Sequence, residues 1–194
     1  LAARAADGAQ WQTPFQPVDY EYGAAPGDWR ADPRQPNARP LTPHWGVVEP
    51  FVIASGAQFR APPPPALDSP EYAAAFAEVQ ALGGDGIGTP TARSADETVA
   101  GIFWGYDAQP FVCAPVKLYN QVAVVLARQR RLSAGASARL LALVNLAMAD
   151  AGIAVWETKY YYDFWRPVTA IREADPGSGP SGLGDGNPLT TGDP

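Results

Sequence analysis

Proline is distributed so unevenly along this chain that it decides where helices can form. Thirteen of the 21 prolines precede residue 71, whereas residues 116–166 contain none. Proline fixes φ and lacks an amide donor, so it interrupts helices and central strands. The 194 residues therefore divide into an irregular N-terminal part and a helical part, and a 46% share of hydrophobic residues is enough for one packed core.

The N-terminal part, residues 1–68, interleaves its prolines with aromatic side chains. Disordered segments are poor in aromatic residues, so we predict an ordered wrap that contains a short polyproline stretch at residues 62–65. Residues 69–172 are predicted to form the helical part. Residues 173–194 are predicted to form a flexible tail rich in glycine and proline.

Capping signals mark the helices of the middle part. Serine N-caps followed by proline or glutamate open the first two. The predicted helices cover residues 70–83, Ser94 toward Trp104, Pro115 to Arg131, and Ser133 or Ser137 to near Arg166, where Pro167 ends or kinks the last one. No alternating run typical of strands appears, so the predicted fold class is mainly α, a helical bundle with long loops.

Charge and residue counts exclude several kinds of site. A net charge of −6 argues against nucleic-acid binding driven by phosphate neutralisation. A single cysteine, Cys113, excludes a disulfide framework and a cysteine zinc site, and we predict that it is a small buried hydrophobe. A single histidine, His44, excludes paired-histidine chemistry within the chain. We predict that His44 is a loop residue satisfied by backbone rather than a catalytic group.

Membrane, dinucleotide and export signals are weak. Asn145 and Asp150 interrupt the most apolar stretch, residues 140–156, so we predict the buried helix of a soluble protein rather than a membrane span. The glycines at positions 177, 179 and 182 match a dinucleotide fingerprint, but they follow no strand and open no helix, which favours a surface loop. No signal peptide is visible. Localisation stays open, and secretion or export to a periplasm after signal removal fits the sequence.

Cations and aromatic residues are combined around residue 160. Lys159 and Arg166 are seven positions apart, so on one helix they share a face, roughly 10 Å apart along the axis. Trp156 lies near that face, and Asp163 lies between the cations. One interpretation is a solvated ladder of ion pairs. The other is a buried oxyanion site, because two buried cations with one carboxylate leave positive charge for an anion to neutralise.

The residues from Trp156 to Pro167 resemble the vanadate-binding stretch of vanadium-dependent haloperoxidases. That family shares its anion pocket with type 2 phosphatidic acid phosphatases and bacterial acid phosphatases. The resemblance rests on the Lys-x6-Arg spacing with its Phe-Trp-Arg-Pro ending, and it extends upstream to residues 45–51, 103–107 and 118–121. It implies that Lys159 and Arg166 bind vanadate oxygens, with phosphate as a mimic. Trp156 would line the halide side of the pocket, and Asp107 would pair with a further vanadate-binding arginine.

The same resemblance implies that this domain is incomplete at both ends. The family needs a Ser-Gly-His element and a vanadium-ligating histidine, both downstream of the Lys-x6-Arg stretch, and neither is present here. We therefore expect no catalytic or metal-ligating residue within the chain and a partner or segment that supplies them.

The function so implied is the oxidation of halide by hydrogen peroxide to hypohalous acid. Two alternatives remain open: a phosphomonoesterase of the same superfamily, and a non-catalytic helical fragment that binds a partner. The preferred halide, the organic substrate and the oligomeric state, including a homo-oligomer, also stay open. We expect neither a nucleic acid nor a membrane as partner.

Overall fold

The structure, a computed structural model, describes residues 4–9, 20–32, 35–105 and 114–192. The helices of this part are η3 (Pro43–Val47), η4 (Gly56–Phe59), α1 (Pro70–Gly83), α2 (Ala95–Gly105), α3 (Ala114–Gln129), α4 (Ala134–Tyr162) and α5 (Pro167–Arg172). Within the described residues there is no strand, only an isolated antiparallel bridge between Asp28 and Phe164. The predicted mainly α fold class is confirmed.

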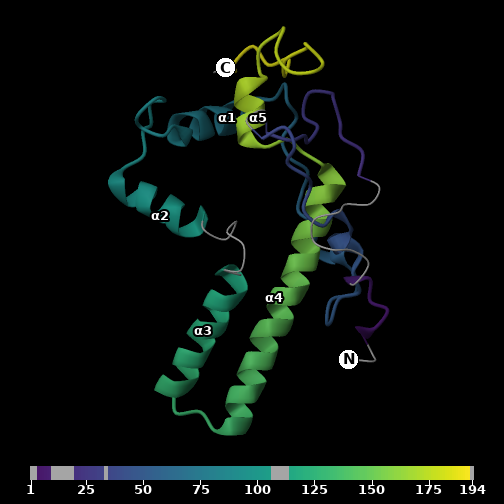
Figure 1. Ribbon diagram of the computed structural model, residues 1–194, viewed down its shortest axis with the longest axis vertical. Coiled ribbons are helices and arrows are strands. Elements are labelled where there is room, and N and C mark those ends of the chain that lie inside the picture. The colour runs from purple at the N-terminus through teal and green to yellow at the C-terminus, as the bar shows by residue number, and fades with distance from the viewer. Residues whose placement is uncertain (1–3, 10–19, 33–34, 106–113, 193–194) are drawn as a thin grey trace.

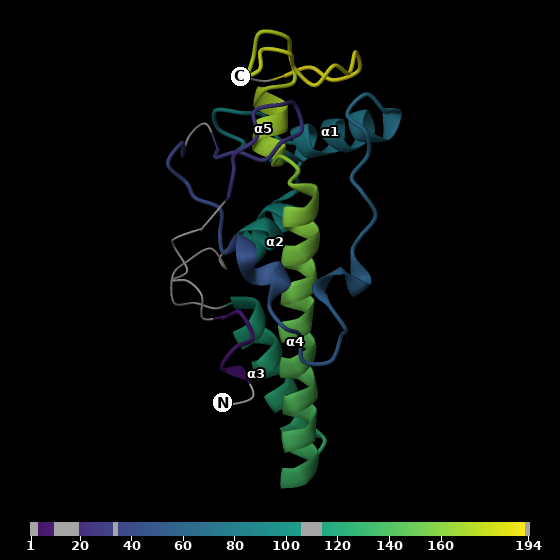
Figure 2. The same ribbon diagram turned by 90° about the vertical axis from the view of Figure 1, so that its right-hand side faces the viewer.

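Helix α4 is the axis around which the other elements are arranged. It runs along most of the length of the molecule, and α3 lies antiparallel beside its first half (Figure 1). The short helices η3 and η4 also pack against α4, and the bluish segments that contain them lie on two sides of it in Figure 2. Beyond the end of α4, α5 packs against α1.

The predicted N-caps are the residues that start the helices. Ser69 caps α1, with Pro70 as its first residue. Ser94 and Glu97 form the reciprocal capping box of α2, in which the Glu97 amide donates to Ser94 Oγ over 3.2 Å and the Ser94 amide donates to Glu97 Oε2 over 2.7 Å. Of the two candidates for α4, Ser133 is the cap.

The prediction that the fourth helix reaches Arg166 is wrong. α4 ends at Tyr162, and Asp163 adopts the left-handed conformation with φ 48° while its amide donates to the carbonyl oxygen of Lys159 over 3.1 Å. A left-handed residue commonly closes a helix in this way. Arg166 has an extended backbone because the residue before a proline is excluded from helical geometry, and Pro167 starts α5.

α4 is also far less buried than its apolar sequence predicts. Asp150 and Ile153 are its buried residues. An 18-residue window with mean hydropathy 1.6 meets the length and composition of a membrane span, and 11% of that window is buried. The expectation that this stretch falls short of a span is therefore corrected. The core helix of a larger helical protein meets the same criterion.

A buried carboxylate fixes the N-terminal wrap to α4. Asp150 Oδ1 accepts the amide of Phe51 over 2.7 Å, and Oδ2 accepts the amides of Val52 over 2.7 Å and Ile53 over 3.0 Å. Asp150 is 4% exposed. This part of the wrap is ordered, as predicted, because its backbone donors are satisfied by a helix side chain.

The C-terminal segment is hydrogen-bonded where the sequence predicted flexibility. The buried Asp185 accepts the hydroxyl of Thr190 over 2.8 Å and the amide of Asn187 over 2.9 Å. The Asn187 side chain donates to the carbonyl of Leu67 over 2.8 Å. The three fingerprint glycines lie in this loop with positive φ and open no helix, in line with the surface-loop interpretation. The predicted divisions at residues 68 and 172 stay predictions.

Candidate oxyanion site

Lys159 and Arg166 lie on either side of the corner between α4 and α5. Lys159 belongs to the last turn of α4, and Arg166 is the N-cap residue of α5. Both side chains are exposed. The predicted burial of both cations is therefore wrong. The predicted shared helical face is also wrong, because the helix ends at Asp163 before Arg166 is reached.

The corner nevertheless brings the two cations close enough to interact electrostatically. Although the residue is exposed, partial desolvation of the Lys159 ammonium lowers its pKa, and the positive charge of Arg166 lowers it further. The Lys159 Nζ atom lies 5.2 Å from the centre of the Trp156 ring and 5.3 Å from that of Tyr160. Within the described residues, neither cation forms an ion pair with a carboxylate.

The two rings beside Lys159 are held by the N-terminal wrap. Trp156 Nε1 donates to the carbonyl of Leu41 and to the hydroxyl of Thr42, both over 3.0 Å. The Tyr160 hydroxyl donates to the same Leu41 carbonyl over 2.8 Å. Burial raises the pKa of the Tyr160 hydroxyl to about 12, so this hydroxyl stays protonated and the side chain stays neutral beside the ammonium. The Trp156 and Tyr160 rings are therefore held in place beside the Lys159 ammonium by these hydrogen bonds.

Asp163 does not bridge the cations as the ladder interpretation expected. Its carboxylate accepts a hydrogen bond from the hydroxyl of Tyr20, a residue 143 positions away in the sequence. Its backbone carbonyl accepts the amide of Trp29 over 2.7 Å. Burial raises the pKa of the Asp163 carboxyl, while the hydrogen bond from Tyr20 lowers it.

Sequence reasoning missed an ion pair on the neighbouring face of α4. Arg60 Nε donates to both carboxylate oxygens of Glu157 over 3.1 and 3.0 Å, and the Arg60 guanidinium lies 3.3 Å from the centre of the Tyr161 ring. The hydrogen bond from Arg60 lowers the pKa of Glu157. Nothing in the sequence indicated this pair, because Arg60 lies in an irregular segment without periodicity.

The other residues singled out from the sequence lie apart from this corner or outside the described residues. Asp107 and Cys113 fall outside them, so their predicted roles stay predictions. His44 lies in η3, and both of its ring nitrogens are buried without a hydrogen-bond partner among the described residues. The expectation of a backbone-satisfied histidine is therefore wrong. No group of three or more potential metal ligands occurs in the described part of the chain.

This corner lies inside the stretch that matches a known family. The family model described as the VCPO second helical-bundle domain matches residues 139–185, which include most of α4 and all of α5. Over 161 residues the chain is 31% identical to vanadium chloroperoxidase of Curvularia inaequalis, covering 73% of this chain and 26% of that protein. The crystal structure of a bacterial vanadium-dependent iodoperoxidase matches with a TM-score of 0.57 and 29% identity, covering 77% of this chain and 37% of that one.

These matches confirm the predicted resemblance: the chain is vanadium haloperoxidase-like in sequence and in its helical fold. It spans about a quarter of the length of the chloroperoxidase and little more than a third of the iodoperoxidase chain.

Proposed function

We propose that this chain supplies Lys159 and Arg166 to the vanadate site of a haloperoxidase that oxidises halide with hydrogen peroxide to hypohalous acid. The observation that carries the proposal is the pair of exposed cations at the α4–α5 corner, without a carboxylate partner in the described residues. Two uncompensated neighbouring cations repel each other, and a bound oxyanion removes that repulsion.

The residues at the corner fit the oxyanion part of such a site. Arg166 offers a planar fork of donors that suits a tetrahedral oxyanion, and Lys159 offers a point charge held beside fixed aromatic rings. When bound, vanadate supplies the Lewis-acid centre at which peroxide becomes able to oxidise halide. The part of this chain is to neutralise the oxyanion with donors that are already in place.

The vanadium-ligating histidine must come from elsewhere, and we propose a further segment or partner chain as its source. The chain matches only part of each relative, which supports this proposal because their additional length leaves room for such a segment. It would pack on the exposed apolar side chains of α3 and α4, among them Val116, Val122, Val125, Leu143 and Val155. The same surface would serve the alternative in which the chain is a non-catalytic helical interaction fragment.

Binding of vanadate and phosphate tests the site directly. We expect calorimetric titration with orthovanadate and with inorganic phosphate to show binding that Lys159→Met and Arg166→Gln each weaken at least about tenfold, the loss expected for one charge-assisted hydrogen bond. The matched control is Arg128→Gln, which removes an exposed cation from α3 and should leave both affinities unchanged. Equal affinities for the wild type and both corner variants would overturn the proposal.

The activity assay separates the haloperoxidase from the phosphatase alternative. The protein expressed from its full reading frame should halogenate monochlorodimedone only when vanadate is added. Hydrolysis of p-nitrophenyl phosphate that is independent of vanadate, without halogenation, would instead identify a phosphomonoesterase that uses the same corner for phosphate.

A further inference from the structure

The carboxylate closest in sequence to both candidate oxyanion ligands is kept away from them. Asp163 is four residues after Lys159 and three before Arg166, at the corner between α4 and α5. Lys159 and Asp163 also line the same small hollow beside Tyr160. An unrestrained Asp163 could therefore reach the cations and take the place of an external anion.

Tyr20 instead forms a hydrogen bond with the Asp163 carboxylate. Its hydroxyl donates to Asp163 Oδ1. The Tyr20 ring packs edge-on against Trp29 and Tyr160, with ring centres 5.4 and 5.8 Å apart. The ring contacts fix where the hydroxyl points, so the hydrogen bond depends on the packing of an aromatic cluster and not on Asp163 alone.

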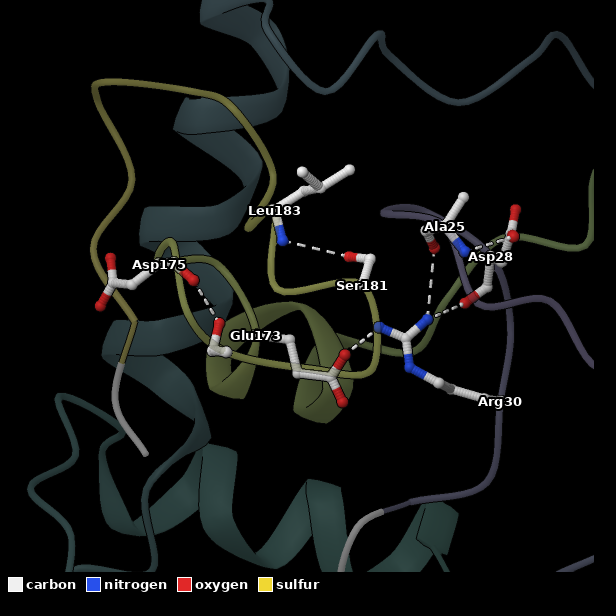
Figure 3. A network of polar contacts seen from close by, with 8 residues as sticks. Ala25, Asp28, Arg30, Glu173, Asp175, Ser181 and Leu183 are labelled. Carbon is white, nitrogen blue, oxygen red and sulfur yellow. Dashed lines mark hydrogen bonds and ion pairs between the residues drawn. The ribbon is translucent and has the colours of Figure 1, made fainter.

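The residues around Tyr20 form an arm, residues 20–30, that is fixed to the corner at further points. The Trp165 amide donates to the Gly27 carbonyl over 2.8 Å, next to the bridge between Asp28 and Phe164. Arg30 pairs with the Glu173 carboxylate just after α5, as Figure 3 shows. These contacts hold the arm against the residues that follow Asp163, so Tyr20 is presented to Asp163 in one position.

We propose that Tyr20 holds the Asp163 carboxylate away from Lys159 and Arg166 and thereby keeps the two cations available to an oxyanion. The inference deepens the proposed function and rests on its oxyanion site. Tyr20 is a positioning residue, because it acts on the cations only through Asp163. Without its hydroxyl, Asp163 pairs with a cation and competes with the incoming anion.

The test uses Tyr20→Phe, Asp163→Asn and the double variant in the 194-residue chain. Inorganic phosphate at low ionic strength is the probe, and its affinity is measured by calorimetry. Tyr20→Phe should weaken phosphate binding about tenfold, the strength of one ion pair with hydrogen bonds. Asp163→Asn removes the competing charge while tolerating the left-handed backbone, so the double variant should recover the affinity of Asp163→Asn alone. Tyr22→Phe, a change on the same arm, is the matched control and should bind as the wild type does.

A second readout does not depend on anion binding. The chain has two lysines, Lys117 and Lys159, so reductive ¹³C-methylation gives two lysine NMR signals besides that of the N-terminal amine, and the exposed Lys117 serves as internal reference. Without phosphate, the Lys159 signal should move in Tyr20→Phe and return toward its Asp163→Asn position in the double variant. Lys117 should not move.

The outcomes are distinct. Wild-type affinity in Tyr20→Phe, or a double variant as weak as Tyr20→Phe, would overturn the inference, since a merely structural role of Tyr20 cannot be rescued at Asp163. If the wild type fails to bind phosphate, the proposed oxyanion site fails. The Lys159 signal then decides whether Tyr20 restrains Asp163: its shift and recovery support that restraint, and its constancy refutes it.

Discussion

Replacing Gly46 with alanine should lower the free energy of unfolding by about 3 kcal/mol, the upper end of the usual cost of forcing an extra methyl group into a packed contact. Gly46 lies in η3, where a Cβ atom would be 2.5 Å from Cα and 2.7 Å from N of Glu157 in α4. Those atoms belong to helix backbone and cannot move aside independently. η3 must therefore separate from α4, and this separation also disturbs the neighbouring Trp156 side chain.

Urea unfolding followed by tryptophan fluorescence measures this effect. Gly135→Ala in the first turn of α4 is the control, because a Cβ there meets nothing within 4 Å. Alanine favours a helix over glycine by up to about 1 kcal/mol, so this variant should be slightly more stable than the wild type. If Gly46→Ala were as stable as Gly135→Ala, the close approach of η3 and α4 would be incorrect.

Asp150→Ala should have an effect of similar size, about 3 kcal/mol or more, because it leaves three backbone donors without their acceptor, each worth about 1–3 kcal/mol when buried. The donors are the amides of residues 51–53. Asp85 offers a matched comparison, because its Oδ1 also accepts three successive amides, those of residues 87–89, but in an exposed loop. Water can replace Asp85, so Asp85→Ala should cost much less. Equal losses of stability in the two variants would contradict the assigned burial.

The same residue predicts how stability depends on pH. Burial alone would raise the pKa of Asp150, but the amide hydrogen bonds and the charge of Arg4 outweigh it, and the net pKa is lowered. A carboxyl group with a lowered folded-state pKa stabilises the fold above its unfolded pKa of about 3.9 and loses that contribution as pH falls through the folded value. Denaturation curves between pH 7 and pH 2 should therefore show a smaller acid-induced loss in Asp150→Ala than in the wild type.

Local signals in the sequence predicted the helices well because each start has its own chemistry. Ser69 before Pro70 and Ser94 before Glu97 place helix starts to the residue, since the cap and the first turn are neighbours in the chain. The end of α4 was not predictable in this way. At that end the Asp163 carbonyl accepts a hydrogen bond from the Trp29 amide, and no local pattern encodes a contact between residues so far apart in the sequence.

The predicted burial of α4 was wrong for a related reason. An apolar sequence predicts that a helix will be covered, but it does not say by what. In this chain α4 is contacted by α3, η3 and η4, and much of its surface stays exposed. The prediction that Lys159 and Arg166 are buried was wrong as well, because it relied on the predicted burial of this helix.

By itself, the sequence determined the helical class and the helix starts and singled out Lys159 and Arg166 as candidates for an oxyanion site, because residue type and spacing carry that information. Only the tertiary structure decided how the site is arranged. It placed Lys159 and Arg166 on two helices instead of one face, and it paired Asp163 with Tyr20 instead of with the cations. The physical reason is that the end of a helix at one left-handed residue, which is hydrogen-bonded by a distant arm, redirects every side chain that follows it.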